Sequence, residues 1–489
     1  MKLYNTKTRQ IEEFIPQNPE NVKIYTCGPT VYSRAHIGNL TSYIYWDLLI
    51  RTLKANDYKV NRVLNLTDVG HLTSDSDEGE DKLEKGAKKE GKTVWEIADF
   101  YIEKFLQDFH ALNLTEPEKI ARATDYIEAD KLAVDAMTKN GFTYETSDGI
   151  YFDTSKFAAY PDFARLDLEN LKAGARVDFS SEKKNPSDFA VWKFIKPGET
   201  HAMRWNYLGR PGYPGWHLEC STIIHEELGE PIDIHTGGID HIPVHHTNEI
   251  AQTFAISGQN LSNFWLHCNF INIDGQKISK SLGNIFTLDD LTARGFSPMD
   301  FKLWVLEGHY QGARNFTFDS LAAAKNRRLA WRNRIALLRQ QTNNSFTDNK
   351  AIFPAEASEA SRCEHAKARG AASGEASRGF PGEKLPIRKT IISLLDTLNH
   401  NLNSPEACAM IDNSEMTLSD WQFVDNLFGL NLIQDSPDIT PEQKQLLSAR
   451  AAARAEKDWP KSDALRAELE KQGITVKDTP SGQIWQYLA

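Results

Sequence analysis

Hydrophobic residues follow two alternating spacings in the first part of the chain. The run VKIYT at 22–26 is β-branched and aromatic, as in a buried strand. The segment LTSYIYWDLL, which begins at Leu40, carries apolar residues at helical spacing, and NRVLNLTDV at 61–69 is strand-like again. Strand, helix and strand in this order predict a βαβ unit with parallel strands, as in a Rossmann-like sheet.

The parallel-strand pattern is interrupted and later returns. Turn-rich pieces such as GRPGYPGW occupy much of 116–220, and PIDIHTGGID at 231–240 resumes the buried-strand pattern. From about 316 the spacing is helical to nearly the end, apart from a low-complexity stretch at about 342–385 in which EAS recurs. We therefore expect an α/β fold with a Rossmann-like parallel-sheet domain, an inserted connective domain and a C-terminal α-helical domain. The expected bounds are 1–120 and 226–315 for the two halves of the sheet domain, 121–225 for the insertion, and 316–489 for the helical region.

Length and composition limit the class of protein and its expected location. A chain of 489 residues is too long for one hydrophobic core. It contains no run of about eighteen apolar residues and no apolar signal region, so we expect neither a membrane span nor export. Five well-separated cysteines argue against a disulfide framework, and these features together predict a cytoplasmic protein. The formal charge of −11 argues against general adhesion to nucleic acid but allows a local basic surface.

The first predicted helix starts with His36-Ile37-Gly38-Asn39. A helix N-terminus presents unpaired N–H groups and a partial positive charge, and both favour an anion. The glycine lets a ligand approach the backbone, and Rossmann-like sheets bind phosphates after their first strand. The tetrapeptide therefore indicates a phosphate site. A histidine that only caps the helix is the alternative interpretation.

A second candidate phosphate site is the sequence KISKS, which contains Lys277 and Lys280 between two glycines. Two lysines with hydroxyl groups between them can bind a polyphosphate and neutralise the charge that develops on a leaving pyrophosphate. A solvated charged turn is the alternative. The chain has no G-x-x-x-x-G-K-[ST] sequence, so a P-loop is excluded.

Four residues have the chemistry of a metal site. Cys27 follows the first predicted strand, Cys220 ends GWHLEC, and His245 and Glu249 lie four positions apart. Positions i and i+4 share one face of a helix, so this imidazole and this carboxylate can bind one ion. Two thiolates, an imidazole and a carboxylate form a plausible zinc shell. Packing of the cysteines as small hydrophobic residues is the alternative.

In combination these motifs resemble the cysteinyl-tRNA synthetases, a family of class I aminoacyl-tRNA synthetases. HIGN stands where the family has HIGH, and KISKS stands where it has KMSKS. Longer segments match in the same order. They are CGPTVY after the first strand, NPSDFAVWK at 185–193, GYPGWHLECS at 212–221, GHYQGARNFTF at 308–318 and the block at 453–485.

The resemblance implies that the chain activates L-cysteine with ATP, accompanied by Mg²⁺, and transfers the cysteine to tRNA-Cys. It also implies one zinc ion, which selects the thiolate of the substrate. The implied zinc ligands are Cys27, Cys220, His245 and Glu249. The other implied positions are His36, Asn39, Lys277 and Lys280 for catalysis, Gly38, Gly237, Gly238, Asp240 and Lys280 for ATP, and Thr67 and Trp216 for the amino-acid pocket.

Transfer to tRNA requires a basic surface. The stretch KNRRLAWRNRIALLR at 325–339 has six basic residues and no acidic residue, so we expect phosphate contacts there. An exposed helix face without a ligand is the alternative. The arginines concerned are Arg327, Arg328, Arg332 and Arg334. The resemblance further implies that the C-terminal helical region reads the anticodon, and we expect the protein to be a monomer.

Two departures from the family pattern and two other functions remain open. Asn39 stands where the family usually has a second histidine, and an acidic insertion occupies 70–80. A ligase that couples cysteine to an amino-sugar would share the adenylate chemistry but would not need residues 386–489. A tRNA-binding relative without catalysis would need neither KISKS nor the predicted zinc ligands.

Overall fold

The structure of the protein is a computed structural model. It describes residues 1–70, 84, 91–167, 182–196, 198, 201–279, 282–342, 389–480 and 482–488. Lys280, most of the acidic segment 70–80 and most of the low-complexity segment 342–385 lie outside these residues.

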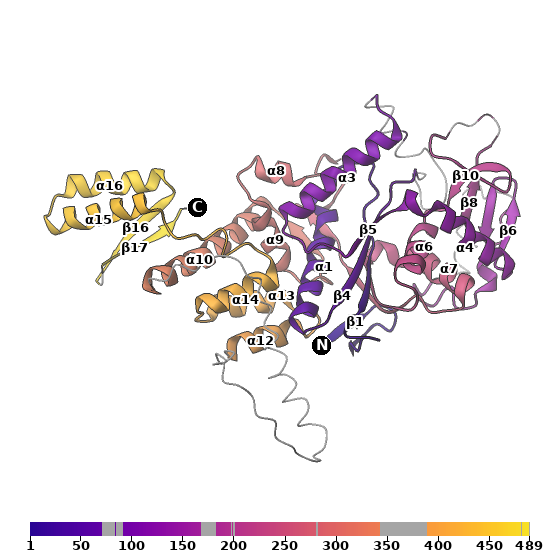
Figure 1. Cartoon of the computed structure of the whole chain (residues 1–489), viewed down its shortest axis with the longest axis horizontal. Helices are drawn as coiled ribbons and strands as arrows, with labels where there is room; N and C mark the ends of the chain where they lie inside the picture. The colour runs from indigo at the N-terminus through magenta and orange to yellow at the C-terminus, as the bar shows by residue number, and fades with distance from the viewer. Residues whose placement is uncertain are drawn as a thin grey trace, which may run out of the picture.

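A parallel sheet of five strands forms the centre of the molecule (Figure 1). Its spatial order is β12-β11-β3-β4-β5, and every neighbouring pair is parallel. The strands are β3 (Val22–Thr26), β4 (Val60–Leu66), β5 (Lys119–Arg122), β11 (Ile232–Gly238) and β12 (Ser262–Cys268). The predicted βαβ unit is therefore present, with α1 (Ile37–Ala55) between β3 and β4.

Hydrophobic side chains cover both faces of this sheet, which explains its continuous apolar runs. Successive residues of a strand point to opposite faces. Ile24 belongs to the large hydrophobic cluster that includes α1, whereas Tyr25 belongs to a cluster with Ile223 and Ile224 of α6 (Leu218–Glu227). The sheet is thus held between α1 on one face and α6 on the other.

The segment between β5 and β11 contains a second, antiparallel sheet. Its order is β6-β7-β8-β10-β9, and it lies at one end of the molecule (Figure 1). Its strands are β6 (Thr143–Thr146), β7 (Gly149–Phe152), β8 (Phe189–Phe194), β9 (Trp205–Tyr207) and β10 (Arg210–Pro214). The helices α4 (Ile127–Lys139) and α7 (Thr247–Ser257) pack beside this sheet, whereas α3 (Val94–Ala111) belongs to the hydrophobic cluster that includes α1. Short helical turns span Ala123–Tyr126, Thr154–Lys156, Ile239–His241 and Ile242–His246.

Smaller elements connect the central sheet to the helical region. They are β1 (Lys2–Asn5), β2 (Gln10–Glu13), β13 (Ile271–Ile273), β14 (Gln276–Lys277), β15 (Arg314–Phe316), α8 (Leu288–Thr292) and α9 (Pro298–Leu306). The helices beyond them are α10 (Phe318–Thr342), α12 (Lys389–Leu398), α13 (Ser404–Asn413), α14 (Leu418–Phe428), α15 (Pro441–Ala455) and α16 (Trp459–Lys471).

The C-terminal region differs from the helical expectation in its last residues. A hairpin of β16 (Ile474–Thr479) and β17 (Gly482–Tyr487) follows α16. Val476 and Trp485 of the hairpin pack with Ala336 of α10, so the hairpin contributes to the small core at this end of the chain. Figure 1 shows this unit at the end of the molecule opposite the antiparallel sheet.

A buried ion pair connects the first helix to the helical region. Lys302 of α9 donates to Asp47 Oδ2 of α1 over 2.8 Å, and Arg51 Nε lies 2.8 Å from the same oxygen. Arg51 also donates to the carbonyl of Asn426 in α14. Burial lowers the pKa of Lys302 to about 8, while Asp47 acts in the opposite direction. One buried carboxylate is thus shared by two cations from different elements.

We expect Lys302→Met to destabilise the protein by about 3 kcal/mol, because removing one member of a buried pair leaves the other incompletely compensated. Urea denaturation followed by tryptophan fluorescence measures this loss. Lys59→Met is the control, since Lys59 and Glu20 form an exposed pair, and we expect it to change stability by less than about 1 kcal/mol. Equal effects of the two substitutions would contradict the structural role of Lys302.

Candidate functional site

The predicted metal ligands lie at the carboxyl ends of β3 and β11. These strands are neighbours, but the chain continues from β3 towards β4 and from β11 towards β12, on opposite sides. Such a point of divergence creates a ligand site in parallel α/β sheets. Cys27 directly follows β3, and its backbone N–H donates to the carbonyl of Thr236 in β11 over 3.2 Å. The thiol is therefore held at the divergence.

Cys27, Cys220, His245 and Glu249 form one buried group, whose candidate ligand atoms all lie within 4.8 Å of one another. Cys220 comes from α6, and Glu249 comes from α7. His245 lies in a π-helical turn immediately before α7, with Nε2 3.5 Å from Cys220 Sγ and 2.9 Å from Glu249 Oε1. The structure thus brings the four residues together from three separate segments.

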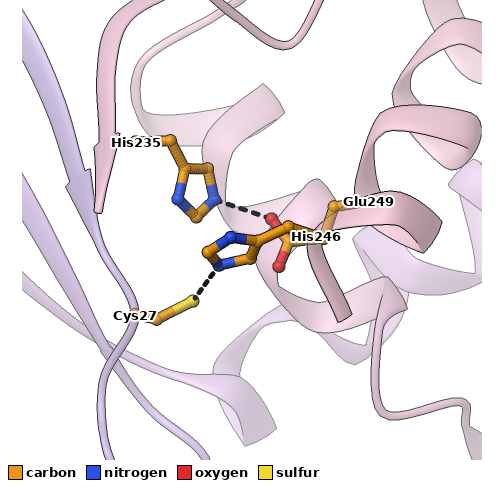
Figure 2. Close-up of side chains that lie close together, drawn as sticks. All are labelled: Cys27, His235, His246 and Glu249. Carbon is orange, nitrogen blue, oxygen red and sulfur yellow. Dashed lines mark hydrogen bonds and ion pairs between the residues drawn. The ribbon is translucent and has the colours of Figure 1, made fainter. Parts of the chain in front are cut away.

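Two further histidines complete a second group that shares Cys27 and Glu249 (Figure 2). His235 Nε2 lies 2.7 Å from Glu249 Oε2, and His246 Nε2 lies 3.5 Å from Cys27 Sγ. The carboxylate of Glu249 therefore presents one oxygen to His245 and the other to His235. Neither His235 nor His246 is among the ligands predicted from the sequence.

The imidazole rings are oriented by contacts on their other sides. His245 Nδ1 lies 2.8 Å from Nδ1 of His217, so Nε2 of His245 is directed towards Cys220 and Glu249. His246 Nδ1 lies 2.7 Å from Nε2 of His267. A metal-binding histidine is usually held by such a contact at its other nitrogen. The one sequence feature that could indicate a role of His217 in the site is its position in GWHLEC.

Burial and hydrogen bonding divide the two thiols into a donor and an acceptor. The hydrogen bond between the thiols, reinforced by burial, raises the pKa of Cys27 well above its usual value. The same hydrogen bond lowers the pKa of Cys220 to about 6, and the cation at His245 adds to this effect. Cys220 is therefore the thiolate of the pair, which is the form that ligates a metal.

The histidines divide in a similar way. Burial alone would lower the pKa of His245, but Glu249 and Cys220 outweigh it and raise the pKa well above the usual value. Burial would also raise the pKa of Glu249, yet the neighbouring His235 and His245 hold it below its usual range. Burial and the adjacent histidines lower the pKa of His246 well below normal, so His246 is neutral. The group thus contains anionic, cationic and neutral side chains.

The donor set fits a metal ion. Glu249 Oε1 and His245 Nε2 are both buried and lie 2.9 Å apart. These two atoms lie next to the sulfurs of Cys27 and Cys220, and the four atoms are arranged like ligands that share one cation. Thiolate and imidazole donors favour zinc and related soft metals.

The HIGN segment forms the first turn of α1. His36 is the N-cap, and its Nδ1 accepts from the backbone N–H of Asn39 over 3.3 Å. The side-chain oxygen of Asn39 accepts in return from the backbone N–H of His36 over 3.1 Å. Because Nδ1 accepts, the neutral His36 ring carries its proton on Nε2. Asn39 therefore caps α1, a role that was not predicted from the sequence.

The described part of the KISKS segment lies against this turn. The backbone N–H of Ile37 donates to the carbonyl of Phe286 over 2.8 Å. A side chain at Gly38 would lie 2.7 Å from Cδ1 of Ile278, so the glycine gives the two segments room to approach this closely. The Asn284 side chain holds the backbone of Lys277 and Ser279. The two predicted phosphate sites are therefore adjacent.

The residues predicted to bind adenosine lie where β11 ends. Gly237 and Gly238 are its last two residues, and Asp240 lies in the following turn. A side chain at Gly237 would lie 2.6 Å from Cε1 of His246, so glycine is required there. Their role in ATP binding stays a prediction.

The two residues predicted for the amino-acid pocket lie near the metal ligands. The ring centroid of Trp216 is 5.2 Å from that of His245. Thr67 follows β4, and its N–H donates to the carbonyl of Pro29 over 3.1 Å, which fixes it beside the loop after Cys27. Both positions are compatible with a substrate pocket, and that role also stays a prediction.

The predicted tRNA-binding arginines of α10 have partners within the protein. Arg328 is only 5 % exposed and pairs with Asp435. Arg327 pairs with Glu307, and Arg334 donates to the carbonyl of Ile411 over 2.8 Å. Arg332 binds the Asp435 carbonyl. These contacts hold α10 to the rest of the helical region, and contact of these arginines with tRNA stays a prediction.

Two parts of the chain match known protein families. Residues 13–326 match the family described as "tRNA synthetases class I (C) catalytic domain", so the chain has the catalytic domain of a class I synthetase. Residues 436–485 match "Cysteinyl-tRNA ligase anticodon binding domain".

Curated relatives are similar in sequence to this chain over nearly the full length of both. A cysteine–tRNA ligase of Burkholderia lata is 40 % identical over 99 % of this chain and 96 % of its own. A cysteine–tRNA ligase of Treponema denticola is 36 % identical over 100 % of both chains. The chain therefore belongs to the cysteine–tRNA ligase family. This finding confirms the predicted resemblance and its class I fold.

Among solved structures, a methionyl-tRNA synthetase of Mycobacterium tuberculosis in complex with methionyl-adenylate is similar in fold. It has a TM-score of 0.54 at 16 % identity and covers 88 % of this chain and 94 % of its own. Among the described residues, no helix has the length and apolar character needed to cross a bilayer.

We expect Asn39→Ala to lower cysteine-dependent exchange of pyrophosphate into ATP by about tenfold, because the loss of a helix cap of about 1 kcal/mol releases His36 from its position. Asn39→His keeps a polar side chain, and we expect activity within about tenfold of wild type. Ser42→Ala, one turn further along α1, is the control. Wild-type exchange in Asn39→Ala would show that the cap does not support the reaction.

Proposed function

We propose that the chain joins L-cysteine to the 3′-terminal adenosine of tRNA-Cys through a cysteinyl-adenylate, and that zinc bound by Cys27, Cys220, His245 and Glu249 selects the substrate. The single observation that supports this most strongly is the buried group of two thiols, an imidazole and a carboxylate. Membership of the cysteine–tRNA ligase family gives the reaction, and the donor set gives the means of selection.

Selection is the difficult part of this reaction, since cysteine and serine differ by one atom. A hydrophobic pocket rejects a substrate with a similar shape by only about a hundredfold. Bound zinc supplies a soft Lewis acid that takes a thiolate in preference to a hydroxyl group. In the proposal Trp216 covers the substrate side of His245, and Thr67 lines the pocket.

Activation needs positioning and charge stabilisation more than proton transfer. The carboxylate of cysteine is already ionised, and it attacks the α-phosphate of ATP as pyrophosphate leaves. The Nε2–H of His36 donates to the phosphates, and Lys277 and Lys280 neutralise the developing charge. Mg²⁺ accompanies ATP, and Gly237, Gly238 and Asp240 bind its adenosine.

Transfer to tRNA uses the rest of the chain. The match of residues 436–485 to an anticodon-binding domain favours tRNA over an amino-sugar as acceptor. Arg327, Arg328, Arg332 and Arg334 would strengthen tRNA binding where their groups can also reach phosphates. We further propose that the protein acts as a monomer in the cytoplasm.

We expect the purified protein to contain about one zinc ion per chain, and we expect Cys27→Ser and Cys220→Ser to lose it, because each removes a thiolate ligand. Elemental analysis after gel filtration gives the metal content. Cys268→Ser is the matched control, since Cys268 is also buried but lies outside the group. Unchanged zinc in both ligand variants would contradict the assignment.

A separate prediction concerns the lysines. We expect Lys280→Ala to reduce cysteine-dependent pyrophosphate exchange by about two to four powers of ten, which is the effect of losing a positioned charge stabiliser. Lys325→Ala, in α10, serves as the control and should retain the wild-type rate. The proposed role of KISKS would be wrong if the Lys280 variant were folded and exchanged pyrophosphate normally.

A further inference from the structure

One arginine connects the segment before His36 to two helices. Arg34 Nε and Nη2 bind the two carboxylate oxygens of Asp108 in α3 over 3.2 and 2.6 Å. Nη1 and Nη2 also bind Asp289 in α8, the latter over 3.0 Å. A single guanidinium thus makes bidentate contacts with two carboxylates from different elements.

The two carboxylates differ in their surroundings. The Asp108 side chain is 3 % exposed, and the Asp289 side chain is 72 % exposed. Burial raises the pKa of Asp108, and the hydrogen bonds from Arg34 oppose this change. Arg34 is therefore anchored to α3 from inside the protein and holds α8 from the solvent side. Only the planar fork of arginine can serve both carboxylates in this way.

Arg34 links the segment before α1 to the helix α8, and both adjoin segments that carry the proposed phosphate chemistry. Arg34 lies two residues before the N-cap of α1, and α8 begins directly after the segment that contains KISKS. The same boundary includes the hydrogen bond from Ile37 N–H to the Phe286 carbonyl and the close approach of Gly38 to Ile278. Arg34 adds a charged side-chain contact to this boundary.

We propose that Arg34 is a positioning residue for adenylate formation. By holding α8 against the segment before α1, it fixes Lys277 opposite His36 while the carboxylate of the substrate cysteine attacks the α-phosphate of ATP. Arg34 does not contact the substrate in this proposal. The inference rests on the proposed function. Its physical basis is that a displacement of about 1 Å in a catalytic group can cost about a hundredfold in rate.

The activation step and the transfer step separate this role from simple stabilisation of the fold. Lys277 and Lys280 are proposed to act only while pyrophosphate leaves. Loss of Arg34 should therefore slow adenylate formation and leave transfer from preformed cysteinyl-adenylate to tRNA unchanged. A general loss of folded protein would lower both steps equally.

The experiment compares Arg34→Ala, Arg34→Lys and Asp289→Asn with wild type in pyrophosphate exchange and in single-turnover transfer. We expect kcat of exchange to fall about 10- to 100-fold in Arg34→Ala, with the KM for cysteine unchanged. Arg34→Lys should recover part of the rate, because it keeps the charge but loses the fork. Asp289→Asn should lower the rate about two- to fivefold, as expected for an exposed pair.

Two further measurements complete the test. The double variant of Arg34→Ala with Asp289→Asn should be no slower than Arg34→Ala alone, because both changes remove the same contact. Glu103→Gln is the charge-matched control, since Glu103 is an exposed acidic residue of α3 that binds Gln107. We expect it to keep the wild-type rate.

The possible results are distinct. Exchange within about twofold of wild type in Arg34→Ala, or equal losses in exchange and transfer, would overturn the positioning role. Absence of cysteine-dependent exchange in the wild-type protein would instead overturn the proposed function. Selective loss of activation, with transfer preserved, would support the role of Arg34.

Discussion

The buried carboxylate of Glu249 is the constraint on which the site depends. A charge without water is costly unless it is paired and hydrogen-bonded. Here His235 from β11 and His245 from the π-helical turn each face one oxygen of the carboxylate. This requirement fixes α7 against the end of β11, and it places Cys27 and Cys220 next to the same group.

Local pattern predicted the parts of the fold and site that depend on local spacing. Continuous apolar runs indicated the parallel strands, and the i, i+4 spacing of His245 and Glu249 indicated a common face. The hairpin of β16 and β17 was missed, although the alternation in ITVKDT and the following PSG were available signals. The hairpin segment follows a long stretch with helical spacing, and for this reason it was interpreted as helical.

Contacts between distant segments could not be predicted in the same way. His235 lies within a strand, so the sequence pattern indicates only a core residue. Its place in the site depends on the pairing of β11 with β3 and on the position of α7. The resemblance placed Asn39 among the catalytic residues, but its side chain caps α1 together with His36, and this pair differs from the common Ser/Thr and Glu pair. Arg328 looked like part of a basic surface, but its partner Asp435 is 107 positions away in the sequence.

The central claim is that a metal ion at this site recognises the substrate by its sulfur. X-ray absorption at the zinc edge tests it most directly, using the zinc-loaded full chain with and without substrate. The account predicts that cysteine adds one sulfur to the zinc coordination shell and that serine adds none. An unchanged number of sulfur ligands in the presence of saturating cysteine would contradict it.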